Sequence, residues 1–237
     1  MKLTTLLLIA SMGLQLQASQ CKIALDIGHS PRKSGAISSR GVPEYQFNRR
    51  AALYTYHKLQ KAGIDAFFVN SDEVEISLHQ RTAIAKEYKA THFISFHHDS
   101  VKELYLSKWV YNGKGRNFCD TYSGYSIFVS KKNKQFSKSL ELASLIGETY
   151  RALGMTPSYH HNEDIPGERK ELLDRHLGVY RYDNLVVLKS AQMPSVLIEC
   201  GIILNREDEP ILWSESHLEK IATGVINGLI QKCKGRQ

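Results

Sequence analysis

Blocks of apolar and polar residues alternate along the chain in a way that predicts an α/β protein. Short apolar runs typical of buried strands occur at residues 21–28, 64–70, 91–98, 123–130, 184–190 and 194–201. Runs with helical spacing occur at residues 44–62, 77–90, 138–154 and 216–233. Because strands that alternate with helices pair in parallel, we expect a single α/β domain with a mostly parallel central sheet flanked by helices.

The first residues follow a different pattern. MKLTTLLLIASMGLQLQAS has one lysine, then an apolar run, then small and polar residues, as in a secretory signal peptide. The apolar run is too short for a permanent membrane span. We therefore expect residues 1–18 to be a signal peptide cleaved after Ala18, and residues 19–237 to be an exported domain, periplasmic or secreted. The alternative is an N-terminal strand or a disordered tail.

Composition adds a basic charge to this picture. The chain has 42% hydrophobic and 23% charged residues, which is ordinary for a globular protein with a sizeable core. Its formal net charge of +7 includes Lys2, which signal cleavage would remove. A basic exported protein is attracted to anionic polymers such as a cell wall, although from charge alone we favour surplus lysines that only maintain solubility. The sequence shows no basic helix with interleaved aromatic residues, so nucleic-acid binding is not predicted.

Four cysteines remain after cleavage, and an oxidising compartment would allow them to form disulfides. Four cysteines can pair completely in three ways, and the sequence does not select one of them. A pair between Cys21 and Cys233 would tie the two ends of the domain together. Cys200 lies in a predicted buried strand, which favours an inert core thiol, and no CxxC spacing indicates a cysteine metal site.

Candidate chemistry gathers at the ends of three predicted strands. His29 follows the first strand, His97 ends the third, and Glu199 lies in the last. Ligand crevices in open α/β sheets lie at the carboxyl ends of the strands, so we expect these side chains to meet. Glu44, in the first turn of the next helix, can point back to the same edge. Two imidazoles and a carboxylate can hold a catalytic zinc ion, and a second carboxylate can act as base.

Each of these residues also has a simpler interpretation. His29 fits a solvated turn, Glu44 a helix N-terminal charge, and Glu199 a buried partner for arginine or lysine. Strand alternation favours His97 over its neighbour as the ligand, and gives His98 a supporting or pocket-wall position. The residues alone leave the metal site and these alternatives open.

Three ordered stretches resemble a known family. LDIGHSPRKSGAISSRGVPEYQFN is similar to the first motif of the zinc-dependent N-acetylmuramoyl-L-alanine amidases of the cell-separation type. SLHQRTAIAKEYKATHFISFHHDS, which includes Arg81, resembles the second motif, and PSVLIECGIILNREDE resembles the last. Together the stretches span the chain from about Cys21 to Cys233.

The resemblance implies hydrolysis of the amide between N-acetylmuramic acid and L-alanine in peptidoglycan. It also implies zinc ligands at His29, Glu44 and His97, and a general acid-base at Glu199. Asp26 is left as a structural or supporting acid. The implied partners are peptidoglycan and, as in some relatives, a protein activator, and we expect a monomer without nucleic acid or a membrane span.

The chain departs from the family pattern at several positions. Proline commonly precedes the first glycine of the family, and a second glycine follows the histidine, where this chain has Ile27 and Ser30-Pro31. His98 replaces a small residue, and Cys200 replaces a threonine or alanine. These departures concern pocket shape and substrate range, because no expected ligand is lost.

Residues 160–176 form a long, charged connection. One alternative is that ERKELLDRHL forms a short helix and that Glu163, Asp164, Glu168 or Glu171 approaches the metal and blocks it. We favour the alternative that this segment is a solvated lid that shapes specificity.

Two other functions fit the same sequence. An inactive or activator-type wall-binding protein would keep the fold, although such relatives usually lose a ligand or the base. A secreted or phage-derived lytic toxin would keep the same chemistry.

Overall fold

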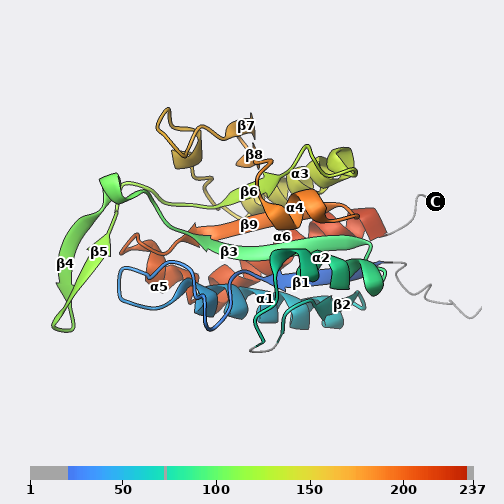
Figure 1. The fold of residues 1–237 in the computed structure, drawn as a ribbon, viewed down its shortest axis with the longest axis horizontal. Coiled ribbons are helices and arrows are strands. Elements are labelled where there is room, and N and C mark those ends of the chain that lie inside the picture. The colour runs from blue at the N-terminus through green and yellow to red at the C-terminus, as the bar shows by residue number, and fades with distance from the viewer. Residues whose placement is uncertain (1–20, 72–73, 234–237) are drawn as a thin grey trace, which may run out of the picture.

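The computed structural model describes residues 21–71 and 74–233, and its centre is one seven-stranded sheet. The strands are β1 (Lys22–Ile27), β2 (Asp65–Phe68), β3 (His92–Asp99), β6 (Ser126–Val129), β7 (Glu171–Asp174), β8 (Val179–Arg181) and β9 (Ser195–Ile202). They lie in the order β2-β1-β3-β9-β6-β8-β7 (Figure 1). Pairing is parallel except between β9 and β6 and between β7 and β8. The expected single α/β domain with a mostly parallel sheet is confirmed.

Helices cover both faces of the sheet. The helices α1 (Glu44–Lys61), α3 (Phe136–Ala152) and α6 (Glu215–Cys233) pack on one face, in the same apolar cluster as the inward residues of β1, β3 and β9. The short helices α2 (Leu78–Glu87) and α4 (Val186–Ser190) pack on the other face. Because helices cover both faces of the sheet, neither face of the central strands is exposed to solvent, which explains their unbroken apolar runs.

One predicted strand is wrong. Residues 184–190 form the helix α4 instead, with Val187 and Leu188 buried in the second apolar cluster. A short apolar run has the same hydrophobic pattern in a buried strand and in a buried helical turn, so periodicity cannot separate the two.

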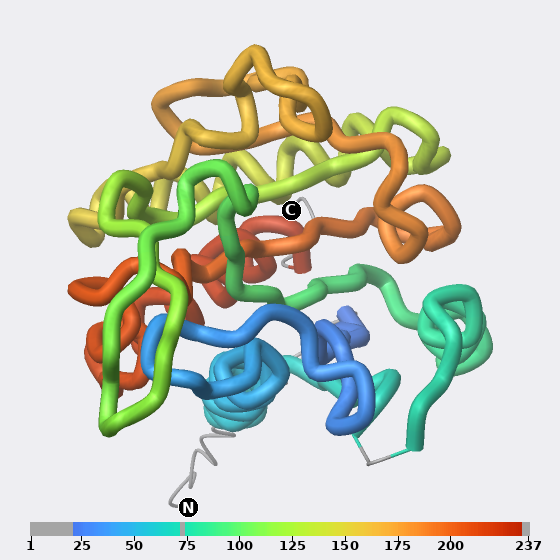
Figure 2. Tube along the Cα trace, turned by 60° about the vertical axis from the view of Figure 1, so that its left-hand side comes forward, coloured from blue at the N-terminus to red at the C-terminus, as the bar shows by residue number. Residues whose placement is uncertain are grey.

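The alternative of a helix in ERKELLDRHL is also wrong. After the 3-10 turn η2 (His160–Asn162) the chain forms the edge strand β7, which pairs antiparallel with β8. Arg169 has a left-handed φ of 59°, which interrupts any helix there. In Figure 2 this yellow-to-orange part of the chain forms the top of the molecule.

A hairpin that the sequence analysis did not predict projects from one end of the sheet (Figure 1). Its strands are β4 (Ser107–Tyr111) and β5 (Lys114–Phe118), joined by Asn112 and Gly113. Both turn residues have positive φ, as a two-residue hairpin turn requires. The remaining short elements are the 3-10 turn η1 (Glu103–Tyr105) and the helix α5 (Asp208–Leu212).

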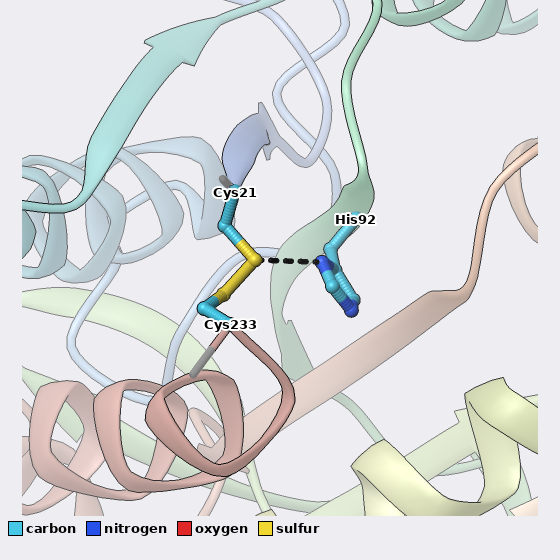
Figure 3. A group of neighbouring side chains, drawn as sticks. All are labelled: Cys21, His92 and Cys233. Atoms are coloured by element: carbon cyan, nitrogen blue, oxygen red, sulfur yellow. Dashed lines mark hydrogen bonds between the residues drawn. A yellow bond between two sulfur atoms is a disulfide. The ribbon is translucent and has the colours of Figure 1, made fainter. Parts of the chain in front are cut away.

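The ends of the domain are joined covalently. Cys21, directly before β1, forms a disulfide with Cys233 at the end of α6, and Nδ1 of His92 lies 3.8 Å from Sγ of Cys21 (Figure 3). This pairing confirms the tie considered from the sequence, and Cys119 and Cys200 are buried free thiols. The predicted signal peptide, residues 1–18, lies outside the described residues. In the described part of the chain, no helix is long and apolar enough to cross a membrane.

Candidate active site

Three of the predicted site residues meet at the carboxyl ends of β1 and β3. Nε2 of His29 lies 3.0 Å from one carboxylate oxygen of Glu44, and Nδ1 of His97 lies 3.2 Å from the other. One donor atom from each residue lies within 4.8 Å of the others. Glu44 is at the start of α1, so the helix points its carboxylate back at the strand ends, as expected from the sequence.

Two glycines leave room for this group. A side chain at Gly28 would place its Cβ 2.5 Å from Nε2 of His97, and one at Gly35 would collide with Glu44 and His29. His29 itself has a left-handed φ of 67°, which turns its ring out of the line of β1 and toward Glu44. The glycine-rich loop therefore packs closely around the three donor atoms.

Arg81 of α2 anchors the loop that carries His29. Its guanidinium donates hydrogen bonds to Asp26 at 2.9 Å, to the carbonyl of Ile27 at 2.7 Å and to the carbonyl of His29 at 2.7 Å. Ser95 on β3 donates to the other oxygen of Asp26 at 2.6 Å. Arg81 and Asp26 are both buried, so this ion pair holds β1 and its loop in place. Asp26 thus has the structural role left for it by the sequence analysis.

Asn48 orients Glu44, a contact that the sequence analysis missed. Its amide donates to a carboxylate oxygen of Glu44 at 3.0 Å and to the carbonyl of Gly28 at 3.2 Å. Its amide oxygen lies 2.8 Å from Nδ1 of His98, which is buried and supports the site from behind. Burial lowers the pKa of His98 to about 3, so the ring is neutral, and its Nδ1–H donates this hydrogen bond to the amide oxygen of Asn48. The sequence signal for the contact between Asn48 and Glu44 was their spacing of four residues on α1, which places both side chains on one face of the helix.

Two carboxylates of the site have opposite electrostatic environments. Burial favours the neutral acid of Glu44, but its contacts with His29 and His97 hold its pKa well below the usual range. Burial and the nearby carboxylates of Asp99 and Glu44 raise the pKa of Glu199 well above its usual range. Such opposed shifts in neighbouring acids are typical of catalytic sites.

Glu199 lies beside His97 in the sheet, because β3 and β9 pair at these two residues. Its Oε2 is buried and makes no hydrogen bond. Within residues 21–71 and 74–233, no arginine or lysine forms an ion pair with it, which removes the sequence-based alternative of a buried salt bridge. A buried carboxylate oxygen without a hydrogen bond or a cation is costly, which makes Glu199 a candidate for a chemical role.

The donor set fits a divalent metal ion of the zinc type. Two imidazole nitrogens and a carboxylate are the ligands of a catalytic zinc that keeps an open position. The His29 side chain is 33% exposed and that of His97 is 19% exposed, so the group is reachable from solvent. A pocket of about 380 Å³ opens beside it, lined in part by Ala36, Ser100 and Arg116. The backbone N–H of Ala36 donates to Glu44 at 3.2 Å, which joins pocket and site.

A second group of potential ligands was not expected from the sequence. Asp99 at the end of β3 meets His160 and His161 from the segment after α3. Among the described residues, no acid of segment 160–176 joins the group formed by His29, Glu44 and His97. The sequence signal for this group was the pair of adjacent histidines at 160 and 161. Their contact with Asp99 could not be predicted, because about sixty residues separate them along the chain.

Comparisons with known proteins agree with this geometry. The family model described as N-acetylmuramoyl-L-alanine amidase matches residues 23–231. The chain is 27% identical over 220 residues to the N-acetylmuramoyl-L-alanine amidase AmiA of Salmonella typhimurium, covering 88% of this chain and 74% of AmiA.

Solved structures share the fold. The amidase Ami1 from Mycobacterium smegmatis superposes with a TM-score of 0.72 at 20% identity, covering 92% of this chain and 99% of Ami1. The CwlD amidase from Clostridioides difficile, solved in complex with the GerS lipoprotein, gives a TM-score of 0.63 at 21% identity, covering 89% of this chain and 97% of CwlD. Since the family model covers nearly the whole described domain, the chain belongs to the N-acetylmuramoyl-L-alanine amidase family.

Proposed function

We propose that the protein hydrolyses the amide between N-acetylmuramic acid and L-alanine of peptidoglycan, with His29, Glu44 and His97 as zinc ligands and Glu199 as general acid-base. The observation that carries this proposal is the convergence of three donor atoms within 4.8 Å, with Glu199 beside His97 and its Oε2 buried without a hydrogen bond. Membership of the amidase family supplies the reaction class and the peptidoglycan substrate.

The chemistry follows from the positions of these groups. A zinc ion held by the three ligands would polarise the amide carbonyl and lower the pKa of a water molecule. Glu199 accepts a proton from the attacking water as the new C–O bond forms, and returns it to the nitrogen as the C–N bond breaks. The products are a carboxylate on the lactyl group of the sugar and a free amino group on L-alanine.

The pocket of about 380 Å³ adjoins the site through Ala36, whose backbone N–H contacts Glu44. It lies between the loop residues Ala36 and Ser38, the residues Ser100 and Val101 after β3, and Arg116 of the hairpin. Trp109 and Tyr111 stack on the same hairpin, with their ring centroids 5.3 Å apart. We assign this pocket to the peptide or sugar that flanks the scissile amide.

The cellular setting remains part of the proposal. The disulfide between Cys21 and Cys233 supports an oxidising compartment, in line with the expected signal peptide over residues 1–18 and with export. CwlD was solved with a lipoprotein, which makes a protein activator a reasonable partner here too. We expect the isolated protein to be a monomer.

The test is digestion of purified sacculi, with released fragments identified by mass spectrometry. We expect free stem peptides with N-terminal L-alanine, released with zinc and lost after chelation. Glu199→Gln removes the proton acceptor at nearly constant volume, so the rate should fall by about 10²- to 10⁴-fold while zinc remains bound. Glu148→Gln, at an exposed position on α3, is the matched control and should keep full activity.

Two results would contradict the proposal. Near-normal activity of Glu199→Gln would remove Glu199 as the base. Zinc binding and sedimentation with sacculi, without any release of peptide, would point to the wall-binding alternative.

A further inference from the structure

We propose that Asp99, His160 and His161 form a second divalent metal site, separate from the group formed by His29, Glu44 and His97. Asp99 is the last residue of β3, and the two histidines begin η2, in the segment that connects α3 to β7. The site therefore joins parts of the chain that are about sixty residues apart. It does not depend on the proposed function, because none of its three ligands has a role there.

The three donor atoms converge in a buried position. Nε2 of His160 lies 3.0 Å and Nε2 of His161 lies 2.7 Å from the same carboxylate oxygen of Asp99. The two imidazole rings are tilted by 37° to one another, with centroids 3.9 Å apart. All three atoms are buried, and none makes a hydrogen bond of acceptable geometry, although they are close together.

The contacts of the two Nδ1 atoms fix the orientation of the imidazole rings. Nδ1 of His161 lies 3.0 Å from a carboxylate oxygen of Glu168, and Nδ1 of His160 lies 2.9 Å from the hydroxyl of Ser158. A carboxylate only accepts, so Nδ1 of His161 must carry the hydrogen, and in a neutral ring Nε2 then presents a lone pair. Without a metal ion, a protonated His161 ring meets the carboxylates of Asp99 and Glu168, and a metal ion bound at Nε2 would replace that proton.

A single proton serves only one of the two nitrogen-oxygen contacts. Neither Nε2 makes a well-directed hydrogen bond to Asp99, although both lie within hydrogen-bond distance of the same oxygen. One divalent ion would satisfy both nitrogens and the carboxylate together. Two imidazoles and a carboxylate are ligands of zinc and related ions, and a carboxylate that holds the far nitrogen of a ligand histidine, as Glu168 does, is the usual support.

The surroundings are built as a site rather than as a solvated cluster. The side chain of His160 is 2% exposed, and that of Glu168 is 6% exposed. Phe128 and Tyr180 pack edge-on against the ring of His161. Lys170 donates to Glu168 at 2.7 Å, which balances the outer carboxylate. A bound ion would clamp the segment leading to β7 onto the end of β3, two residues after His97.

The test is metal stoichiometry on the oxidised protein, with any affinity tag removed. Zinc content after dialysis is measured by mass spectrometry, and titration with Co²⁺ is followed by its visible absorption. We expect two equivalents per chain. His161→Gln and Asp99→Asn should each reduce the content to one, and His29→Gln should also leave one. Combining His29→Gln with His161→Gln should leave none. His176→Gln, an exposed histidine in the same segment, is the matched control and should keep two.

The outcomes separate this inference from the proposed function. One equivalent in the wild type, lost with His29→Gln and kept with His161→Gln, would overturn the second site. Two equivalents that survive both His161→Gln and Asp99→Asn would overturn it as well. One equivalent lost with His161→Gln and kept with His29→Gln would support the second site and contradict the first. Thermal melting with added Zn²⁺ in the His29→Gln background gives a second readout, and we expect stabilisation that His161→Gln abolishes.

The protein must stay oxidised in these measurements. Cys21, His92 and Cys233 lie close enough to bind an ion if the disulfide is reduced. Omitting reductant keeps both sulfurs in the disulfide and removes this third group from the count.

Discussion

Removing the disulfide between Cys21 and Cys233 should destabilise the protein more than most single cross-links do. The bond closes a loop with a sequence separation of 212 residues, so it restricts nearly the whole unfolded chain. The loop-entropy relation gives about 5 kcal/mol for a loop of this length at 25 °C. Replacing both cysteines with serine avoids a lone thiol, and we expect the free energy of unfolding to fall by about 3 to 5 kcal/mol.

The measurement is urea unfolding at neutral pH, followed by circular dichroism and tryptophan fluorescence. The slope of free energy against urea should rise in the double variant, because an unfolded chain without the cross-link exposes more surface. Under reducing conditions the wild type should unfold like the variant. Cys119→Ala, which removes a buried free thiol, should leave the difference between oxidised and reduced protein intact. A difference below about 1 kcal/mol would refute the loop-closure argument.

Three further predictions concern the site and its support. Gly28→Ala would push its Cβ into the ring of His97. Zinc affinity, measured by competition with a chelating dye, should therefore fall by about 10- to 100-fold. Gly115→Ala, which has open space around its Cβ, should not change the affinity. Arg81→Met leaves the buried carboxylate of Asp26 without its cation and should cost about 3 to 5 kcal/mol in urea unfolding; an unchanged midpoint would contradict this role. Burial lowers the pKa of His217 from 6.5 to about 4 in the folded protein. Between these two pH values the imidazole is protonated in the unfolded chain but still neutral in the folded protein. About 3 kcal/mol of stability should therefore be lost as the pH falls from 6.5 to 4. His217→Gln should flatten that part of the pH profile, and an equally steep profile would assign the loss to other groups.

The two candidate metal groups differ in what holds them together. His29, Glu44 and His97 come from segments that follow one another along the first part of the chain, and β1 and β3 are neighbours in the sheet. Asp99, in contrast, reaches across to η2, which precedes the far edge of the sheet at β7. An ion in the second group would therefore link the two halves of the sheet at the edge where the substrate is expected.

Much of the site could be predicted from the sequence, because its chemistry lies at the ends of strongly apolar strands. The positions of His29, His97 and Glu199 relative to those strands, and the rule that parallel strands end at the same edge, were sufficient to bring them together. Glu44 followed from its place in the first turn of a helix. These are local patterns, and the tertiary structure preserved them.

Other features depended on contacts between distant segments. Within residues 184–190 the chain forms the helix α4, and its buried Val187 and Leu188 share an apolar cluster with Ala85 of α2, a contact that the short apolar run does not reveal. Residues 171–174 within ERKELLDRHL form an edge strand that pairs with β8, and a local helical pattern carries no information about such a partner.

The sequence by itself determined the α/β class, the edge of the sheet that carries the chemistry and the four residues proposed for it. Only the tertiary structure showed that Cys21 pairs with Cys233 while Cys119 and Cys200 stay free, and only it brought His160 and His161 to Asp99. The physical reason is common to both: cross-links and ligand groups between distant segments depend on how the sheet is ordered and how its loops pack. Neither property is encoded in the local alternation of apolar and polar residues.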